Sequence, residues 1–148
     1  MTAAALQKYL EDHIPIVKAN RFTVADASPD RVAIGGRLAD HVNHRDSAFG
    51  GSLSTALILA AWGQVRLWTD NFAPNTVIVI AQQRVSFHLP VLQDFEAVSL
   101  PLSTATLDRA RSMLTRFHKA RFTVEAILVH TGDTQARAEF AGEFVVVL

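Results

Sequence analysis

The strongest hydrophobic pattern in the chain is a long apolar segment between Leu53 and Trp68. Its apolar residues recur at the i, i+4, i+7 and i+8 spacing of one helix face, and further apolar residues cover the other sides. A helix with so little polar surface is typical of a protein interior. Gln64 and Arg66 interrupt the segment before it reaches the ~20 apolar residues that a membrane span needs. The pattern therefore predicts a buried central helix, which would be about 30 Å long.

Shorter segments on both sides of this helix alternate apolar and polar residues, as strands with one buried face do. On the N-terminal side the pattern predicts an amphipathic helix over 3–13, ended by Pro15, and a hairpin of strands over 17–27 and 31–38. On the C-terminal side it predicts strands over 77–89, 96–103, 119–130 and 135–148, and a short helix over 106–114 with Thr106 as its N-cap. Strands joined by hairpins form a largely antiparallel sheet. One apolar helix packed along a curved antiparallel sheet is an α+β architecture.

The segment from Val77 to Ile80 is entirely apolar, which predicts a strand that is covered on both faces. Val79, Val145 and Val147 would share the outer face of the predicted sheet with Val77 or Ile78. An apolar sheet face and a free sheet edge both need cover. We therefore expect a second copy of the chain to supply it, in a homodimer or a dimer of dimers.

Composition narrows the class of protein further. The 148 residues suffice for one domain with a real core, which we expect to span 1–148. Lys plus Arg equals Asp plus Glu, and a formal net charge of zero argues against a nucleic-acid-binding protein. The chain has no cysteine, and its six histidines show no metal-ligand spacing, so we expect neither disulfides nor a metal site. The first residues do not resemble a signal peptide, and we expect a cytoplasmic protein without membrane contact.

Several motifs along the chain occur together in one known family. They are Asn43, Phe49-Gly50-Gly51-Ser52, Ala61-Trp62-Gly63, Ile78-Val79-Ile80, Pro90-Val91, Asp94-Phe95 and Gly142-Glu143-Phe144-Val145. With these motifs the chain, from about Leu6 to its C-terminus, resembles the YiiD C-terminal-domain family of thioesterases in the hotdog-fold superfamily. The resemblance implies a curved antiparallel sheet wrapped around one long central helix, and a homodimer or higher assembly. It also implies a small-molecule acyl thioester of coenzyme A or acyl carrier protein as substrate, with no cofactor besides that coenzyme A.

Two features depart from the pattern of many hotdog thioesterases. Those enzymes carry a histidine directly before the two glycines, where this chain has Phe49. They also carry an Asp or Glu further along the central helix, whereas the first carboxylate here is Asp70, near the predicted end of the helix. Both departures leave the identity of the general base open.

Gly50 and Gly51 fall at the expected start of the central helix, where backbone N–H groups are free and the helix dipole is positive. Glycine also lets a ligand approach the backbone closely. A thioester carbonyl oxygen, which gains negative charge in the tetrahedral transition state, would be stabilised there. The alternative is that the two glycines only allow close packing.

Polar residues near the helix start supply the candidates for water activation. Asn43 could orient the carbonyl or the attacking water, or could shape the loop through an Asx turn. Asp46 is the nearest carboxylate and could act as base, or could cap the helix or pair with the neighbouring arginine. His44 and His88 are the other candidate bases. Ser54 could bind the water or the thioester, or could satisfy its own backbone.

Substrate contacts are predicted at Phe49 and at a segment of the partner protomer from Arg84 to His88. Lys119 and Arg121, with Arg116, could contact the phosphates of coenzyme A, or could be solvated charges at a strand end.

Three functions remain open at this stage. The favoured one is hydrolysis, with the oxyanion on the Gly50 and Gly51 amides and the water held by Asn43 and Asp46. The second is a non-catalytic module that binds an acyl chain or acyl-CoA. A hotdog dehydratase or hydratase is less favoured, because the sequence suggests no histidine paired with an acid in the arrangement that those enzymes use. The chain also lacks the Gly-x-Ser-x-Gly motif, which argues against a serine-hydrolase triad.

Overall fold

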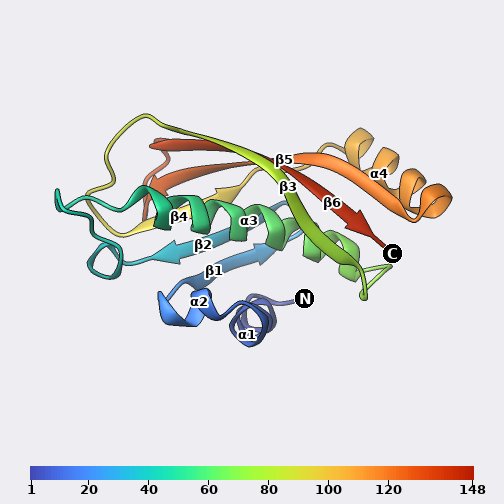
Figure 1. Ribbon diagram of the computed structural model, residues 1–148, viewed down its shortest axis with the longest axis horizontal. Coiled ribbons are helices and arrows are strands. Elements are labelled where there is room, and N and C mark those ends of the chain that lie inside the picture. The colour runs from blue at the N-terminus through green and yellow to red at the C-terminus, as the bar shows by residue number, and fades with distance from the viewer.

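The computed structural model describes all residues, 1–148. Six antiparallel strands form one curved sheet in the order β1-β2-β4-β5-β6-β3, and a long helix, α3, lies along it (Figure 1). The helices are α1 (Ala3–His13), α2 (Pro15–Ala19), α3 (Gly50–Asp70) and α4 (Thr104–Phe117), with a single 3-10 turn at Leu38–Asp40. The strands are β1 (Thr23–Ser28), β2 (Arg31–Gly36), β3 (Val77–Phe87), β4 (Phe95–Ser99), β5 (Lys119–His130) and β6 (Ala138–Val147). The predicted α+β hotdog fold is confirmed.

Helix α3 is buried because small residues let it approach the sheet closely. Ala56, Ala60 and Ala61 are inaccessible to solvent, and a Cβ added at Gly63 would lie 3.1 Å from Cγ1 of Val32. A larger side chain at these positions would push the helix away from β2. No helix of the structure is long and apolar enough to cross a membrane.

Gln64 and Arg66, which interrupt the apolar segment, are also buried. Arg66 pairs with Asp70 at 3.2 Å, and its guanidinium lies 5.1 Å from the centre of the Tyr9 ring. An opposite charge and an aromatic face together stabilise a guanidinium that is largely removed from water.

The alternation of apolar and polar residues along β5 and β6 corresponds to the two faces of the sheet. The residues that face α3 are Ala120, Phe122, Val124, Ala126 and Leu128 on β5, and Ala138, Phe140, Gly142, Phe144 and Val146 on β6, all of which are buried. Arg121, Thr123 and Glu125 alternate with them on the outer face and are exposed. Strand periodicity alone therefore assigned the two faces of the sheet.

Several element boundaries were predicted wrongly, and two of them have a clear local cause. Residues 15–19, expected to end a helix and begin a strand, form α2 with Pro15 in its first turn, where a fixed φ and a missing N–H are tolerated. Helix α4 begins at Thr104, and its N-cap is Ser103, not Thr106. The Ser103 hydroxyl accepts a hydrogen bond from the Thr106 backbone N–H at 3.1 Å.

The connections also differ from the expected series of hairpins. Only β1–β2 and β5–β6 follow one another as neighbours without an intervening helix. Strand β3 pairs with β6 at the far edge of the sheet, so the chain must cross to reach β4. This crossing carries the segment after β3 past the start of α3 (Figure 1).

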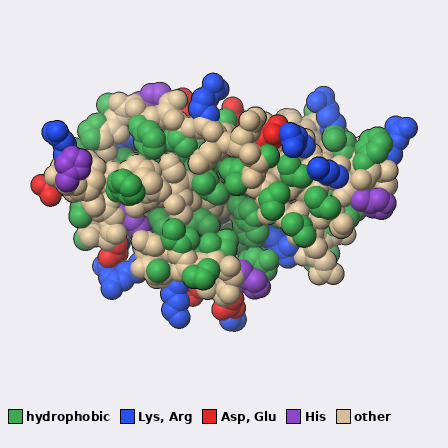
Figure 2. All heavy atoms as spheres, in the orientation of Figure 1, with side chains coloured by type: hydrophobic (Ala, Val, Ile, Leu, Met, Phe, Trp, Pro, Cys, Tyr) green, Lys and Arg blue, Asp and Glu red, His purple; other side chains and the backbone are tan.

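The apolar run at the start of β3 is covered on one face only within a single chain. Ile78 is 9% exposed, but Val77 and Val79 are 58% and 49% exposed. In the orientation of Figure 1, hydrophobic side chains gather over the middle of the molecule and charged side chains lie around the rim (Figure 2). Cover of this strand by a second copy stays a prediction.

Candidate functional site

The first turn of α3 presents two backbone N–H groups without partners. Phe49 is the N-cap, and its side chain cannot accept a hydrogen bond from the turn. The backbone N–H groups of Ser52 and Leu53 both donate to the Phe49 carbonyl, at 2.9 and 3.2 Å. Those of Gly50 and Gly51 donate to no protein atom. Two free donors thus lie at the positive end of a 21-residue helix.

The two glycines have different surroundings. The Phe49 ring lies against Gly51, and a Cβ there would come within 3.1 Å of Cδ1 and Cζ of that ring. A Cβ at Gly50 would meet only the Phe87 ring, at an ordinary 3.6 Å. A side chain at position 51 would therefore have to displace the exposed Phe49 ring, whereas position 50 has room for a Cβ.

Asn43 organises the loop that precedes α3. Its Oδ1 accepts hydrogen bonds from the backbone N–H groups of Arg45 and Ser47, at 2.8 and 3.3 Å, and its Nδ2 donates to the Ser47 hydroxyl at 3.0 Å. The Phe49 N–H donates to the His41 carbonyl at 2.7 Å, which closes the base of the loop. The Asx-turn arrangement is present. Both polar atoms of the Asn43 side chain are thus already bonded within the loop, and any contact with a substrate would be additional to this structural role.

Asp46 lies in this loop with a left-handed backbone, φ 57°, which aspartate tolerates better than most residues. Its exposed carboxylate neither caps α3 nor pairs with Arg45, and it makes no hydrogen bond. The structural roles considered for Asp46 are therefore wrong. His44, in the same loop, is exposed as well.

His88 approaches the helix start from the end of β3. A shallow pocket of about 270 Å³ is lined by Gly50 and Leu53 of α3 and by residues 87–91. His88 is a residue of this wall, and its Nε2 lies 3.3 Å from Oε2 of Glu139 on β6. This contact is exposed to solvent on both sides, with side-chain exposures of 48% and 64%. Sequence reasoning missed Glu139 because the pair depends on the β3–β6 register, in which Ser86 lies opposite Glu139.

The hydroxyl groups in the first turns of α3 behave differently from each other. Thr55 donates to the Gly51 carbonyl at 2.9 Å and so satisfies its own helix. Ser54 is half-buried, and its hydroxyl has no protein partner. Because Ser54 is four residues after Gly50, it lies one turn along the same helix face.

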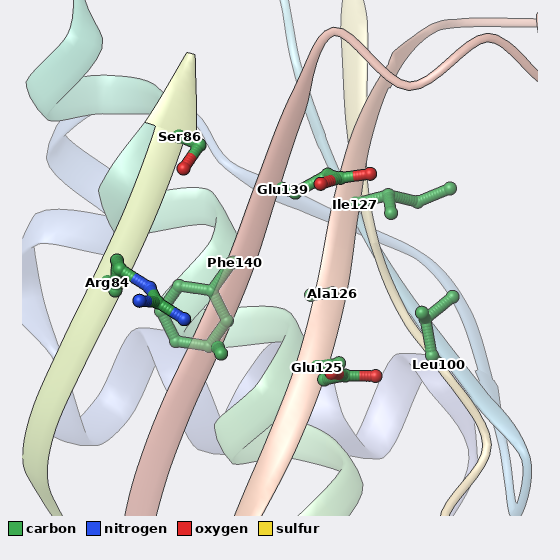
Figure 3. A pocket seen from close by; sticks show the side chains of 9 residues that line it. Arg84, Ser86, Leu100, Glu125, Ala126, Ile127, Glu139 and Phe140 are labelled. Atoms are coloured by element: carbon green, nitrogen blue, oxygen red, sulfur yellow. The ribbon is translucent and has the colours of Figure 1, made fainter. Parts of the chain in front are cut away.

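Arg84 lies on the outer face of the sheet, turned away from α3. It extends from β3 toward β6 over a hollow of about 360 Å³, whose wall also contains Ser86, Glu125 and Glu139 (Figure 3). It forms no ion pair. The structure thus places Arg84 on the opposite face of β3 from the free amides of the same chain.

Lys119 and Arg121 lie far from the helix start within one chain. Lys119 is opposite Val147, which is opposite Val77, whereas Gly50 adjoins Phe87 at the other end of β3. At about 3.3 Å per residue, the length of β3 puts these two ends roughly 30 Å apart. The charge of Arg121 is also compensated by Glu143, whose Oε1 lies 3.0 Å from Nη1 of Arg121.

Comparison with known proteins identifies the family. The model of the family YiiD_C, described as "Putative thioesterase (yiiD_Cterm)", matches residues 3–148. This chain belongs to the YiiD_C family. Membership supports thioester hydrolysis as the general class of chemistry. Among curated proteins, no sequence matches this YiiD_C chain.

Solved structures show the same fold. A protein "with unknown function" from Chlorobaculum tepidum TLS is 23% identical, with a TM-score of 0.91, over 98% of this chain and 93% of its own. A "putative thioesterase" from Shewanella oneidensis is 24% identical, with a TM-score of 0.82, over 99% and 97% of the two chains. A "probable thioesterase" from Pseudomonas aeruginosa is 16% identical, with a TM-score of 0.81, over 99% and 96%.

His41 is the most unusual titratable group of this YiiD_C protein. It is 3% exposed, its ring lies 4.6 Å from the Phe22 ring and 5.5 Å from the Phe95 ring, and neither ring nitrogen has a partner. Burial lowers the pKa of His41 more than the nearby Asp40 carboxylate raises it. A neutral imidazole therefore forms the base of the loop that leads to α3. No group of three or more His, Asp or Glu side chains is placed to hold a metal ion.

Proposed function

We propose that this YiiD_C protein hydrolyses acyl thioesters of coenzyme A or acyl carrier protein at the start of α3. The observation that carries the proposal is the pair of free N–H groups at Gly50 and Gly51, beside a pocket whose wall includes His88. Free amides at a helix start are suited to an oxygen that becomes negative during reaction.

In the proposed reaction a water molecule attacks the thioester carbonyl carbon. The carbonyl oxygen becomes an oxyanion and accepts hydrogen bonds from the amides of Gly50 and Gly51. The intermediate collapses when the carbon–sulfur bond breaks, which yields a carboxylic acid and a thiol. Thiolates are fair leaving groups, so the reaction requires no cofactor.

The base proposed here is His88, which belongs to the wall of the pocket at Gly50. A neutral imidazole that donates its Nε2–H to Glu139 keeps a lone pair on Nδ1, which can take a proton from the attacking water. That proton then passes to the departing thiolate. Asp46, whose carboxylate has no partner, is the competing base, while Asn43 and the Ser54 hydroxyl are proposed to position the water.

A second copy of the chain would complete the site. Strand β3 is an edge strand with exposed Val77 and Val79, and edges of this kind pair readily with another chain. A homodimer or a dimer of dimers would give the remote Arg84, Lys119 and Arg121 a route to a substrate bound at the partner's helix start. Phe49, which is 58% exposed, would contact the acyl part of that substrate.

A proline at position 50 tests the oxyanion assignment. Proline is favoured in the first turn of a helix, and Phe49, with ψ 130°, already has the extended backbone that precedes proline. Gly50→Pro therefore removes one N–H donor with little cost to the helix. Gly50→Ala keeps the donor and has room for its Cβ. Gly51→Val is a poorer test, because its side chain would displace the Phe49 ring.

The assay is thiol release from acyl-CoAs of short, long and aromatic acyl groups. We expect Gly50→Pro to lower kcat by about 10²–10³-fold, the loss typical of one oxyanion donor, and Gly50→Ala to stay within a few fold of wild type. Equal activity of both variants would overturn the assignment.

The absence of a carboxylate from α3 before Asp70 favours a second candidate, a module that binds acyl-CoA without hydrolysis. Saturable acyl-CoA binding by wild type, without thiol release from any substrate, would support that candidate.

A further inference from the structure

The segment over 88–92 follows β3, at the end of the sheet where α3 begins (Figure 1). It supplies His88 and three further residues to the wall of the pocket at Gly50, and it has no regular secondary structure. An irregular segment lies where its individual backbone hydrogen bonds hold it. We propose that Arg137 is a positioning residue, which holds this segment, and with it His88, against the start of α3. The inference rests on the proposed hydrolysis at that site.

Arg137 binds the first three residues of the segment. Its backbone carbonyl accepts hydrogen bonds from the N–H groups of His88 and Leu89, at 2.9 and 3.1 Å. Its Nη1 donates to the Pro90 carbonyl at 2.8 Å. Its own backbone N–H donates to the Leu128 carbonyl of β5 at 2.7 Å, so Arg137 is itself anchored to the sheet. One residue thus fixes three consecutive positions of the pocket wall.

The rest of the segment is tied to the loop before α3 and to β5. The Val91 carbonyl accepts a hydrogen bond at 2.8 Å from the N–H of Ala48, which directly precedes the N-cap of the helix. The Leu92 N–H donates to Nε2 of His130, the last residue of β5, at 3.1 Å. Because these residues are consecutive, a displacement of the segment would move both His88 and its contact with the loop that leads to the helix start.

The guanidinium of Arg137 makes no other polar contact. It forms no ion pair, its Nε is buried without a partner, and the Pro90 carbonyl is its one hydrogen-bond acceptor. A charged donor makes a stronger bond than a neutral one. Pro90 is exposed, so water could replace this donor at little cost in stability. What the guanidinium supplies is a fixed position, which a mobile water molecule does not.

Two substitutions at position 137 separate the donor from the rest of the side chain. Arg137→Met removes the donor and keeps a long unbranched chain. Arg137→Lys keeps a charged donor, and lysine is a suitable replacement because the contact uses a single N–H group rather than a fork. Arg31→Met is the matched control, since Arg31 is also partly buried but belongs to β2, which does not border the pocket at Gly50.

Thiol release from acyl-CoAs measures the effect on the reaction. Arg137→Met should lower kcat by about 10- to 100-fold, because a misplacement of about 1 Å can cost that much. KM and the midpoint of thermal unfolding should change much less than kcat. Arg137→Lys and Arg31→Met should stay within a few fold of wild type. A residue with a merely structural role would instead lower the midpoint and leave the kcat of folded molecules unchanged.

Amide hydrogen exchange reports on the segment without reference to turnover. The backbone N–H groups of His88, Leu89 and Leu92 are all hydrogen-bonded in wild type. In Arg137→Met they should exchange about tenfold faster, the value of one net hydrogen bond, while amides in the middle of β5 should be unchanged. Arg137→Lys should exchange as wild type does.

Three results would overturn the proposal. One is wild-type exchange of these three amides in Arg137→Met. Another is wild-type kcat in that variant. The third is a loss of kcat in Arg137→Lys as large as in Arg137→Met. A wild-type protein that releases no thiol from any substrate would overturn the hydrolysis instead, and hydrogen exchange would still decide whether Arg137 holds the segment.

Discussion

The two ends of α3 differ in whether their polar groups have partners within the protein. At its start, Gly50 and Gly51 leave two N–H groups unpaired beside a shallow pocket, and the neighbouring Phe49 and Asp46 are exposed. Toward its end, Arg66 is buried with an acidic partner and an aromatic ring. The start keeps polar groups available to a ligand, whereas the end uses them within the protein. Changes at the start should therefore alter turnover, and changes toward the end should alter stability.

The largest effect is expected for the proposed base at the start. His88→Gln should lower kcat by about 10²–10⁴-fold, the usual contribution of general base catalysis, with no change in the midpoint of thermal unfolding. Asp46→Asn is the matched variant of the competing base. Thiol release measured across pH in both variants decides between them. A full loss in Asp46→Asn with activity retained in His88→Gln would transfer the role to Asp46.

A large loss of stability is expected for a truncated side chain in the buried middle of α3. Leu57 is fully buried, and Leu57→Ala should lower the free energy of unfolding by about 2–5 kcal/mol through lost burial and the cavity left behind. Turnover per folded molecule should be unchanged. Urea unfolding combined with thiol release measures both quantities. A large fall in kcat without a loss of stability would contradict the division between packing and chemistry.

A smaller loss is expected for the ion pair near the helix end. Asp70→Asn leaves the largely buried Arg66 without its partner, which should cost about 1–3 kcal/mol. Asp12→Asn breaks a pair of the same i,i+4 spacing, Lys8–Asp12, whose side chains are 77% and 51% exposed. That variant should leave the free energy of unfolding almost unchanged, because an exposed ion pair is screened by water. Similar losses in the two variants would mean that burial of Arg66 does not decide the cost.

The smallest effect is expected for the pH dependence of folding stability. Burial lowers the pKa of both His41 and His130 in the folded protein, so the unfolded chain binds protons first as the pH falls. Stability should therefore be constant above pH 6.5, the ordinary value, and should fall as the pH drops from there toward the lowered pKa values. His41→Phe removes one of the two groups while keeping an aromatic ring between Phe22 and Phe95. Thermal unfolding at pH 7.5 and 5.5 should show a smaller difference for this variant than for wild type.

The contrast between the ends of α3 also shows which features can be predicted from the pattern of neighbouring residues. Apolar spacing predicted the helix, and the glycine pair predicted its start, because both are properties of neighbouring residues. The burial of Gln64 and Arg66 did not follow from their polar character. Their surroundings come from Pro29, Tyr9 and Asp70, two of which are distant in sequence.

For the candidate site, residue types near Gly50 were identified from sequence, but their arrangement was not. Asn43 and Ser54 lie where the sequence suggested, on the loop and on the first turns of the helix. The sheet separates Arg84 from the free amides of its own chain, and Lys119 and Arg121 lie at its other end. Such relations depend on the face and the register of paired strands, which single-strand patterns do not encode.

The sequence by itself determined the elements whose signal is periodic and local: the central helix, the inner faces of β5 and β6, and the family resemblance carried by its motifs. Only the tertiary structure decided that β3 pairs with β6 and that His88 therefore meets Glu139. It also decided that Gln64 is buried, with its side-chain amide oxygen unpaired. The physical reason is that periodicity reports how deeply a residue is buried, whereas its partner is chosen by contacts between segments far apart in the chain.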